Sequence, residues 1–201
     1  MVVMRRLVPA LFLVLAGVVG AAAQAGLAER RIGVEWHDGV PHVTFGVRDL
    51  ADASVRRVLS SGLAKQMVVT IQSYRGRSQV PLATRVLSCR VTYDLWEEAF
   101  VVRRGRRTEV ARTADQALGL CLDLSRIPIG VAADYAAVRG SDVYFAVRAE
   151  FNPIAASSCP RLLRNPAGDD PLVPVVVNIV RRENCQAERA LEFRSPAGRV
   201  P

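Results

Sequence analysis

The chain has 201 residues, a formal net charge of +8 and only 6% aromatic residues. This length is typical of one domain that can bury a continuous hydrophobic core. Few aromatic side chains are available for stacking on bases, so we expect no nucleic-acid partner. Nearly all of the positive charge is arginine, because Lys65 is the only lysine. Such a basic surface attracts anionic material over long range.

Residues 1–25 have the order of a secretory signal peptide. Two arginines precede a short apolar run at 7–19, and two overlapping A-x-A sites end at Ala23 and Ala25. The apolar run is shorter than the roughly 20 residues that a membrane-spanning helix needs. We therefore expect cleavage after Ala23 or Ala25, export to the bacterial periplasm, and no transmembrane segment in the mature chain.

The clearest local element after the signal is a hairpin over residues 31–48. Asp38-Gly39 is a strong signal for a two-residue turn, and a turn there pairs Glu35 with His42. In this register the side chains separate into one polar and one apolar face. This separation supports the predicted register. The apolar face consists of Ile32, Val34, Trp36, Pro41, Val43, Phe45 and Val47.

Capping residues and side-chain alternation predict the elements that follow. Asp52 is a suitable N-cap for a helix over 52–61, and Thr113 with Gln116 three residues later predicts the start of a second helix. Alternating apolar and polar residues predict strands at 66–74, 83–95, 100–103, 108–111 and 143–151.

The four cysteines of the chain lie after the signal and show no C-x-x-C spacing. They are Cys89, Cys121, Cys159 and Cys185. An even number in an exported domain favours disulfides over thiol or zinc chemistry. Of the three possible pairings we favour Cys89–Cys121 with Cys159–Cys185, because each bridge then joins sequence neighbours.

We expect these elements to form a mostly β domain over residues 26–153. The preferred architecture is an antiparallel β-sandwich of about seven to nine strands with two short helices, and a small closed β-barrel is the alternative. Residues 154–194 are expected to form a disulfide-bracketed extension with one or two strands, the clearest at 173–180. Residues 195–201 are expected to be a frayed tail.

Four segments resemble an uncharacterised family of exported bacterial proteins, a domain of unknown function. The resemblance covers about residues 30–153, and its most distinctive piece is Tyr93-Asp94-Leu95-Trp96 within the segment Arg90-Val91-Thr92-Tyr93-Asp94-Leu95-Trp96-Glu97-Glu98. The other segments are Val43 to Leu50, Leu59-Ser60-Ser61-Gly62-Leu63 and Phe151-Asn152-Pro153. The resemblance implies an envelope location and a mostly β domain, and it brings no catalytic residues.

Glu35, His37 and His42 are the first candidate site. On the predicted hairpin they share one polar face. Glu35 lies opposite His42, and His37 lies diagonal to His42. Two imidazoles and a carboxylate suit zinc, copper or iron. The simpler interpretation is a solvated face that holds both histidines of the chain.

A second candidate is the acidic cluster of Asp94, Glu97 and Glu98 around Trp96. Paired catalytic carboxylates need a defined separation across a cleft, which neighbours at a strand end do not supply. We expect exposed charges and a half-buried Trp96 there, with a ligand contact by Trp96 as the functional alternative.

The densest basic cluster surrounds Gly105 and consists of Arg103, Arg104, Arg106 and Arg107. Its place between two predicted strands indicates the tip of a hairpin. We expect a solvated turn there, and an anion-binding site is the alternative.

The sequence contains no nucleophile elbow, phosphate loop or dinucleotide fingerprint. Three functions therefore remain open to it. The preferred one is a non-catalytic exported envelope protein. It would be a periplasmic binding or assembly module that acts on an envelope protein or an anionic envelope polymer through a sheet edge or face. The second is a carrier of a small apolar ligand. The third is a metal-dependent enzyme that uses the N-terminal hairpin face. We expect no organic cofactor.

Overall fold

A computed structural model describes residues 27–78, 80–153 and 187–201 of the chain. The predicted signal peptide, the predicted Cys159–Cys185 bridge and the predicted strand at 173–180 lie outside these residues. Within the described ranges, no helix is both long enough and apolar enough to cross a membrane.

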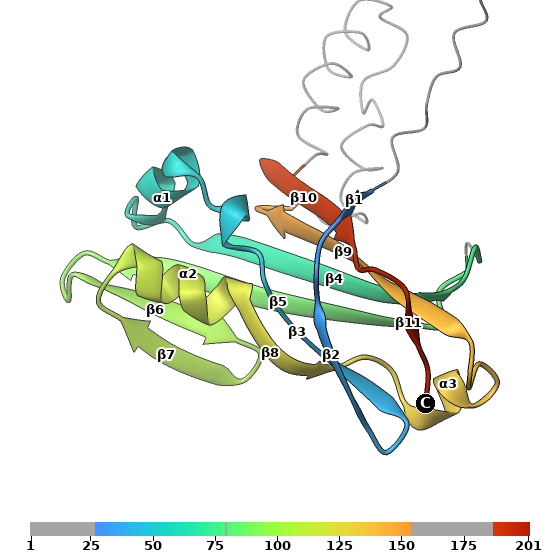
Figure 1. The fold of residues 1–201 in the computed structure, drawn as a ribbon. Coiled ribbons are helices and arrows are strands. Elements are labelled where there is room, and N and C mark those ends of the chain that lie inside the picture. The colour runs from blue at the N-terminus through green and yellow to red at the C-terminus, as the bar shows by residue number, and fades with distance from the viewer. Residues whose placement is uncertain (1–26, 79, 154–186) are drawn as a thin grey trace, which may run out of the picture.

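The described residues form a large and a small β-sheet (Figure 1). The large sheet has the strand order β1 (Ala28–Glu29), β10 (Arg189–Arg194), β9 (Asp142–Phe151), β4 (Lys65–Arg75), β5 (Ala83–Asp94), β6 (Ala99–Arg104) and β7 (Arg107–Ala111), and β11 (Gly198–Arg199) also pairs with β9. All of its pairs are antiparallel except β1 with β10. The small sheet has the order β2 (Gly33–His37), β3 (Val40–Gly46) and β8 (Asp123–Pro128).

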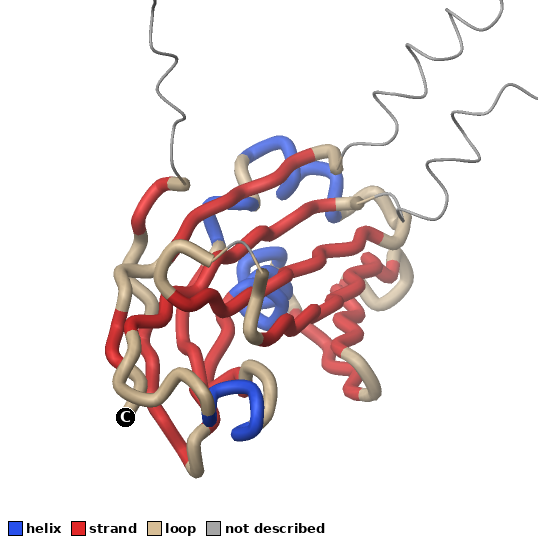
Figure 2. Tube along the Cα trace, turned by 90° about the vertical axis from the view of Figure 1, so that its right-hand side faces the viewer, coloured by secondary structure: helices blue, strands red, loops and turns tan. Residues whose placement is uncertain are grey.

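Residues 27–78, 80–153 and 187–201 also contain four short helical segments. They are η1 (Arg48–Leu50), α1 (Ala53–Leu59), α2 (Ala114–Leu122) and α3 (Ala132–Ala136). Figure 2 shows α1 and α3 at opposite ends of the molecule, with α2 between them. The predicted helices at 52–61 and from Thr113 are confirmed as α1 and α2, whereas α3 was not predicted.

Capping side chains explain why α1 and α2 begin where they do. The Asp52 carboxylate accepts hydrogen bonds from the backbone N–H groups of Ser54 and Val55. The Thr113 hydroxyl accepts one from the backbone N–H of Gln116. Each bond satisfies an N–H that has no partner inside its helix.

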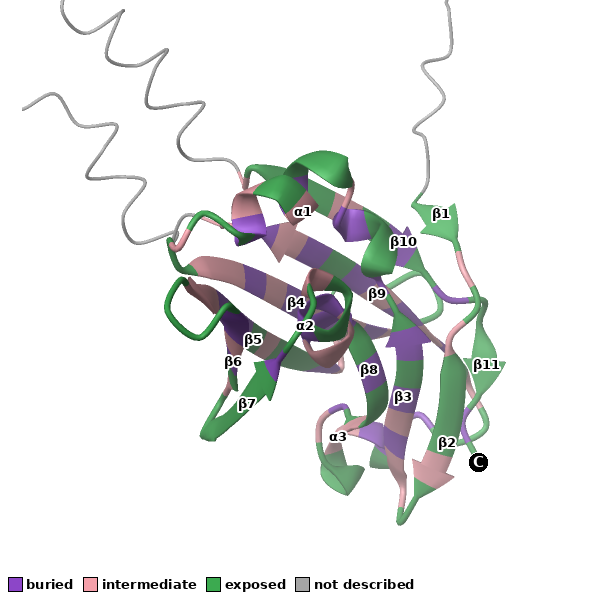
Figure 3. Ribbon diagram, turned by 90° about the vertical axis from the view of Figure 1, so that its left-hand side faces the viewer, coloured by how far each residue is buried: buried purple, intermediate pink, exposed green. Residues whose placement is uncertain are grey.

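The core lies between one face of the large sheet and a second layer made by the small sheet with α2. Alternate residues of β3, β4 and β9 are buried, which is the pattern of strands with one covered face (Figure 3). The largest buried side chains include Phe151, Phe193, Leu50, Leu59, Met67, Ile71, Leu118 and Leu122. The predicted sandwich-like, mostly β fold is therefore confirmed, and the sheets do not close into the alternative barrel.

The predicted bridge between Cys89 and Cys121 is present and joins β5 to α2, with the two Cα atoms 5.5 Å apart. Cys89 is buried on the covered face of the large sheet, and Cys121 is buried on the side of α2 that packs against it. Alternation in the strand and helical spacing in α2 both predict these orientations.

The end of the chain differs from the prediction of a frayed tail at 195–201. The Ser195 backbone N–H donates to the Phe145 carbonyl, and the Phe145 N–H donates to Ser195 Oγ. Gly198 and Arg199 then pair with β9, and Val200 is buried. This segment is ordered because it pairs with Asp142 and Val143, the part of β9 that β10 does not cover. The strand β10 also belongs to the large sheet, whereas the sequence predicts that residues 154–194 form a separate extension.

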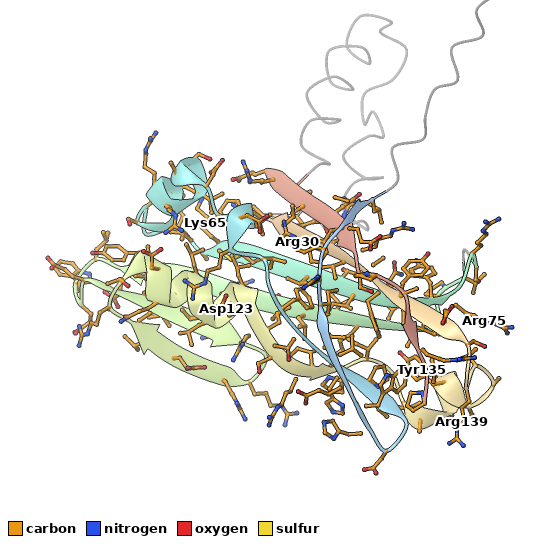
Figure 4. The ribbon with its side chains drawn as sticks, viewed as in Figure 1. Arg30, Lys65, Arg75, Asp123, Tyr135 and Arg139 are labelled. Carbon is orange, nitrogen blue, oxygen red and sulfur yellow. A yellow bond between two sulfur atoms is a disulfide. The ribbon has the colours of Figure 1, made fainter. Side chains whose placement is uncertain are left out.

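A buried polar network fixes α3 against the large sheet. The Tyr135 hydroxyl donates to the Ile129 carbonyl at 3.0 Å and lies 2.9 Å from Ser73 Oγ. Trp36 packs edge-on against the Tyr135 ring, with the ring centroids 5.3 Å apart. Figure 4 labels Tyr135 at the α3 end of the molecule. Burial raises the pKa of Tyr135 to about 12, although the hydrogen bond with Ser73 lowers it.

Replacement of both Cys89 and Cys121 by alanine should lower the free energy of unfolding by about 3–4 kcal/mol. The bridge closes a loop with a sequence separation of 32, and it restricts the unfolded chain by that amount. Urea unfolding of the oxidised protein and of the double variant measures the difference. Equal midpoints with equal slopes would contradict this contribution.

The Tyr135 pKa predicts a loss of stability at alkaline pH. Because folding favours the neutral phenol, its contribution is complete below about pH 10 and is lost as the pH rises toward about 12. Tyr135→Phe should cost about 1–3 kcal/mol at neutral pH through the lost hydrogen bonds. Urea unfolding across this pH range should show a smaller alkaline loss for Tyr135→Phe than for the unmodified protein. An identical pH dependence of both proteins would refute the assignment.

Candidate functional site

The strand β5 is only half covered on the side away from β4. It has 12 residues, and β4 pairs with residues 83–91 of it. In contrast, β6 pairs only with Cys89–Asp94. Within the described part of the chain, no strand lies beside residues 83–88 on that side. This free half of β5 is an exposed edge whose backbone N–H and C=O groups can pair with an added strand.

The short reach of β6 follows from the turn that ends it. Arg104 pairs with Arg107, so only Gly105 and Arg106 form the connection to β7. Gly105 has a φ of +58°, which glycine adopts without the strain that a side chain would introduce. The chain reverses at this point, and the free half of β5 continues past the turn.

A cleft of about 590 Å³ opens beside the free half of β5. One wall is β5 and the other is β8, which runs past the end of the β6–β7 hairpin (Figure 1). Its lining is mainly apolar and includes Met67, Val69, Leu87, Leu124, Ile127 and the Cys89–Cys121 bridge. The strand β8 was not predicted, and with it the cleft was missed.

Three arginines line this cleft, which we call the arginine cleft. Arg85 pairs in register with the buried Ile71, and Arg104 pairs with the buried Cys89. Residues opposite each other in a ladder share one face of the sheet, so both arginines lie on the covered side. Arg107 is the pairing partner of Arg104 on β7 and lines the cleft beside it.

The positive charge of the arginine cleft is poorly neutralised. Within residues 27–78, 80–153 and 187–201, Arg85 and Arg107 make no ion pair. Arg104 Nη2 comes only within 4.0 Å of Glu109 Oε1. The cleft is therefore cationic around an apolar floor, a combination that suits an anionic ligand with apolar parts.

Among the described residues that line the cleft, Asp123 alone carries a carboxylate, and this carboxylate is already engaged. Arg48 Nε donates to Asp123 Oδ1 at 2.9 Å, and Arg48 Nη2 also donates to this carboxylate. The hydrogen bonds and the charge of Arg48 lower the pKa of Asp123, while desolvation opposes them. Asp123 therefore holds the start of β8 to η1, and its charge is engaged by Arg48.

The predicted hairpin with Glu35, His37 and His42 forms in the predicted register, with Glu35 opposite His42. Glu35 Oε2 lies 3.4 Å from His37 Nε2 and 3.9 Å from Arg126 Nε. The rings of His37 and His42 meet edge to face at 4.9 Å between centroids. Among the described residues, no group of three or more His, Cys, Asp or Glu side chains is arranged to hold a metal ion. These contacts fit the solvated polar face.

Trp96 is 95% exposed, which corrects the expectation of a half-buried side chain. The Asp94 carboxylate accepts hydrogen bonds from the backbone N–H groups of Trp96 and Glu97. These bonds form the turn between β5 and β6, where strand alternation no longer directs side chains inward. The turn lies beyond the half of β5 that β6 covers, so Trp96 does not belong to the arginine cleft.

No family model matches the chain, and no curated protein or solved structure is similar enough to match it. The resemblance to an uncharacterised exported family therefore stays a prediction.

The dye 8-anilinonaphthalene-1-sulfonate should bind in the arginine cleft, because it joins apolar rings to an anionic group. Replacement of both Arg85 and Arg107 by glutamate should weaken this binding by about tenfold or more, since each charged contact contributes about 1.5–3 kcal/mol. Titration of the dye fluorescence at constant protein concentration measures the change.

Arg103→Glu is the matched control for this experiment. Arg103 lies on the same hairpin, but its partner Arg90 is exposed and belongs to the opposite face of the sheet. Dye binding to this variant should stay within about twofold of the unmodified protein. A similar loss in the control, or no loss in the double variant, would show that the cleft arginines do not hold the anion.

Proposed function

We propose that this protein is a non-catalytic exported envelope protein, a periplasmic binding or assembly module that holds another envelope component in its arginine cleft. The observation that carries the proposal is the free half of β5, which opens into a preformed cleft with poorly neutralised arginines. Such a sheet edge offers backbone pairing, and the arginines offer selectivity for an anionic partner.

The chemistry of the lining residues supports binding rather than catalysis. Arginine stays protonated in proteins, so Arg85, Arg104 and Arg107 are suited to hold an anion and not to exchange protons with a substrate. The carboxylate of Asp123 is held by Arg48, which lowers its pKa and keeps it charged. Neither kind of group is poised for general acid–base catalysis near neutral pH.

Two features support export. The first 25 residues have the order of a signal peptide, and disulfides persist in oxidising compartments such as the periplasm. The bridge between Cys89 and Cys121 fits that environment. An anionic envelope polymer and an acidic envelope protein are both partners that a cationic cleft would attract.

One observation favours a second candidate, the carrier of a small apolar ligand. The floor of the arginine cleft is apolar, and its volume of about 590 Å³ falls in the range of small-molecule sites. A carrier would bind one ligand of defined mass, whereas an assembly module would bind a macromolecule. Cross-linking from the walls of the cleft separates them.

A photoreactive benzoylphenylalanine in place of Leu87 or Ser125 should cross-link to an envelope macromolecule in the cells that produce the protein. These positions lie on opposite walls of the arginine cleft, on β5 and β8. The same residue in place of Arg90, which is exposed on the other face of β5, should give no such adduct. Denaturing electrophoresis followed by mass spectrometry identifies the adducts.

The outcomes of cross-linking separate the candidates. One discrete macromolecular adduct from both cleft positions supports the binding module. An adduct with a single lipid-sized mass supports the carrier instead. Equal adducts from Arg90, or none from either cleft position, would remove the arginine cleft as the functional site.

A further inference from the structure

We propose that the arginine cleft takes an extended acidic segment of a partner protein, which adds to the free half of β5 as a further strand. This inference rests on the proposed binding function and names the chemistry of its partner. Three features of the structure support it: the direction of the backbone groups on β5, the length of the free edge and the arrangement of the arginines.

The turn between β6 and β7 fixes which backbone groups of β6 face β5. A two-residue turn closes on a pair of residues that exchange backbone hydrogen bonds, here Arg104 and Arg107. Because the direction of these groups alternates along a strand, the N–H and C=O of Arg103 point the other way, toward Arg90 of β5.

The same alternation runs back along β5. Arg90 directs its backbone groups toward β6, so Ser88, Val86 and Thr84 direct theirs to the same side. Pairing of β5 with β4 continues through all of these residues without a register shift. Three N–H and three C=O groups therefore face the side of β5 on which the described residues place no strand. They are a template for one added strand.

The free edge has the length of an ordinary strand. Residues 83–88 span about 20 Å at about 3.4 Å per residue, and strands of about five or six residues are the most common. An added strand would lie in line with β6, beyond the turn at Gly105-Arg106. It would bring alternate side chains into the arginine cleft, next to Leu87 and Arg85.

The charge of the cleft selects which side chains enter. Arg85 approaches from β5, while Arg104 and Arg107 approach from the hairpin that the added strand would extend. Guanidinium groups bind carboxylates through two parallel hydrogen bonds, which makes glutamate or aspartate the favoured residue at the inward positions. Outward positions would lie beside Val86, which is 58% exposed and suits an apolar neighbour.

These features favour a protein segment over a lipid or a polysaccharide. A headgroup or an anionic polymer satisfies arginines, but neither has the regular N–H and C=O spacing that pairs with a strand edge. Only a peptide uses both the arginines and the backbone groups of Thr84, Val86 and Ser88.

The test uses two end-blocked peptides of about ten residues, one alternating valine with glutamate and one alternating valine with lysine. Calorimetry should detect binding of the glutamate peptide to the full mature protein, at least about tenfold tighter than the lysine peptide. Val86→Pro removes one free N–H without breaking a bond to β4, and it should weaken the glutamate peptide by about tenfold or more.

Val110→Pro is the matched control, because Val110 lies on the outermost strand β7, is 63% exposed and pairs with Val101. Alternation along β7 from Arg107 points the N–H of Val110 away from β6, so the variant removes an N–H from the other edge of the hairpin. It should leave binding within about twofold of the unmodified protein. The Arg85→Glu and Arg107→Glu double variant should prefer the lysine peptide.

Hydrogen exchange keeps the test decisive if Val86→Pro does not fold. In the unmodified protein, the glutamate peptide should slow exchange of the Thr84, Val86 and Ser88 amides, and it should leave the amide of Val110 unchanged. Absent slowing, no binding of the glutamate peptide, equal binding of both peptides, or a loss confined to Val110→Pro would each overturn the proposal.

Cross-linking at Leu87 distinguishes failure of the added-strand proposal from failure of the proposed binding function. A lipid or polysaccharide adduct, or an adduct within the chain itself, would overturn the added strand. A lipid or polysaccharide adduct would still leave the arginine cleft as a binding site. Absence of every cleft adduct would remove the proposed function as well.

Discussion

The arginine cleft depends on one covalent bond, the bridge between Cys89 and Cys121. Cys89 is the residue of β5 at which pairing with β6 ends, and Cys121 lies in the last turn of α2. Because α2 runs directly into β8 at Asp123, the bridge also fixes where β8 begins relative to β5. The cleft is the space between these two strands. A bond that stabilises the core therefore also joins the two walls of the arginine cleft.

Local signals predicted much of the fold, whereas elements that depend on distant partners were missed. The hairpin with its turn at Asp38-Gly39, the N-caps Asp52 and Thr113, and the strand alternation all act over a few residues and appear in the sequence. The strand β8 does not alternate cleanly, because Arg126 has a φ of +52° and the register with β3 shifts between Val43 and Phe45. The tail at 195–201 is ordered only because β9 leaves it an edge to pair with.

The candidate site was only partly accessible from the sequence. The predicted strand at 83–95 is much longer than its neighbour at 100–103, a mismatch that already implies an unpaired half. Arg85 also falls on the same side of that strand as Leu87, so an arginine on an apolar face was visible. The opposite wall could not be foreseen, since it needs β8. Exposure of Trp96 likewise follows from bonds made by Asp94 within the turn, which alternation does not describe.

The arginines also explain how the free half of β5 can stay open without pairing two copies of the chain. An uncovered edge is a hazard for self-association, and inward-facing charges are one way in which proteins block it. If two copies joined along this edge, the cleft arginines of both would face one another across an apolar space, where like charges repel strongly. An acidic strand reverses the sign of that interaction. The charge that opposes self-pairing would therefore also select the acidic partner that we propose.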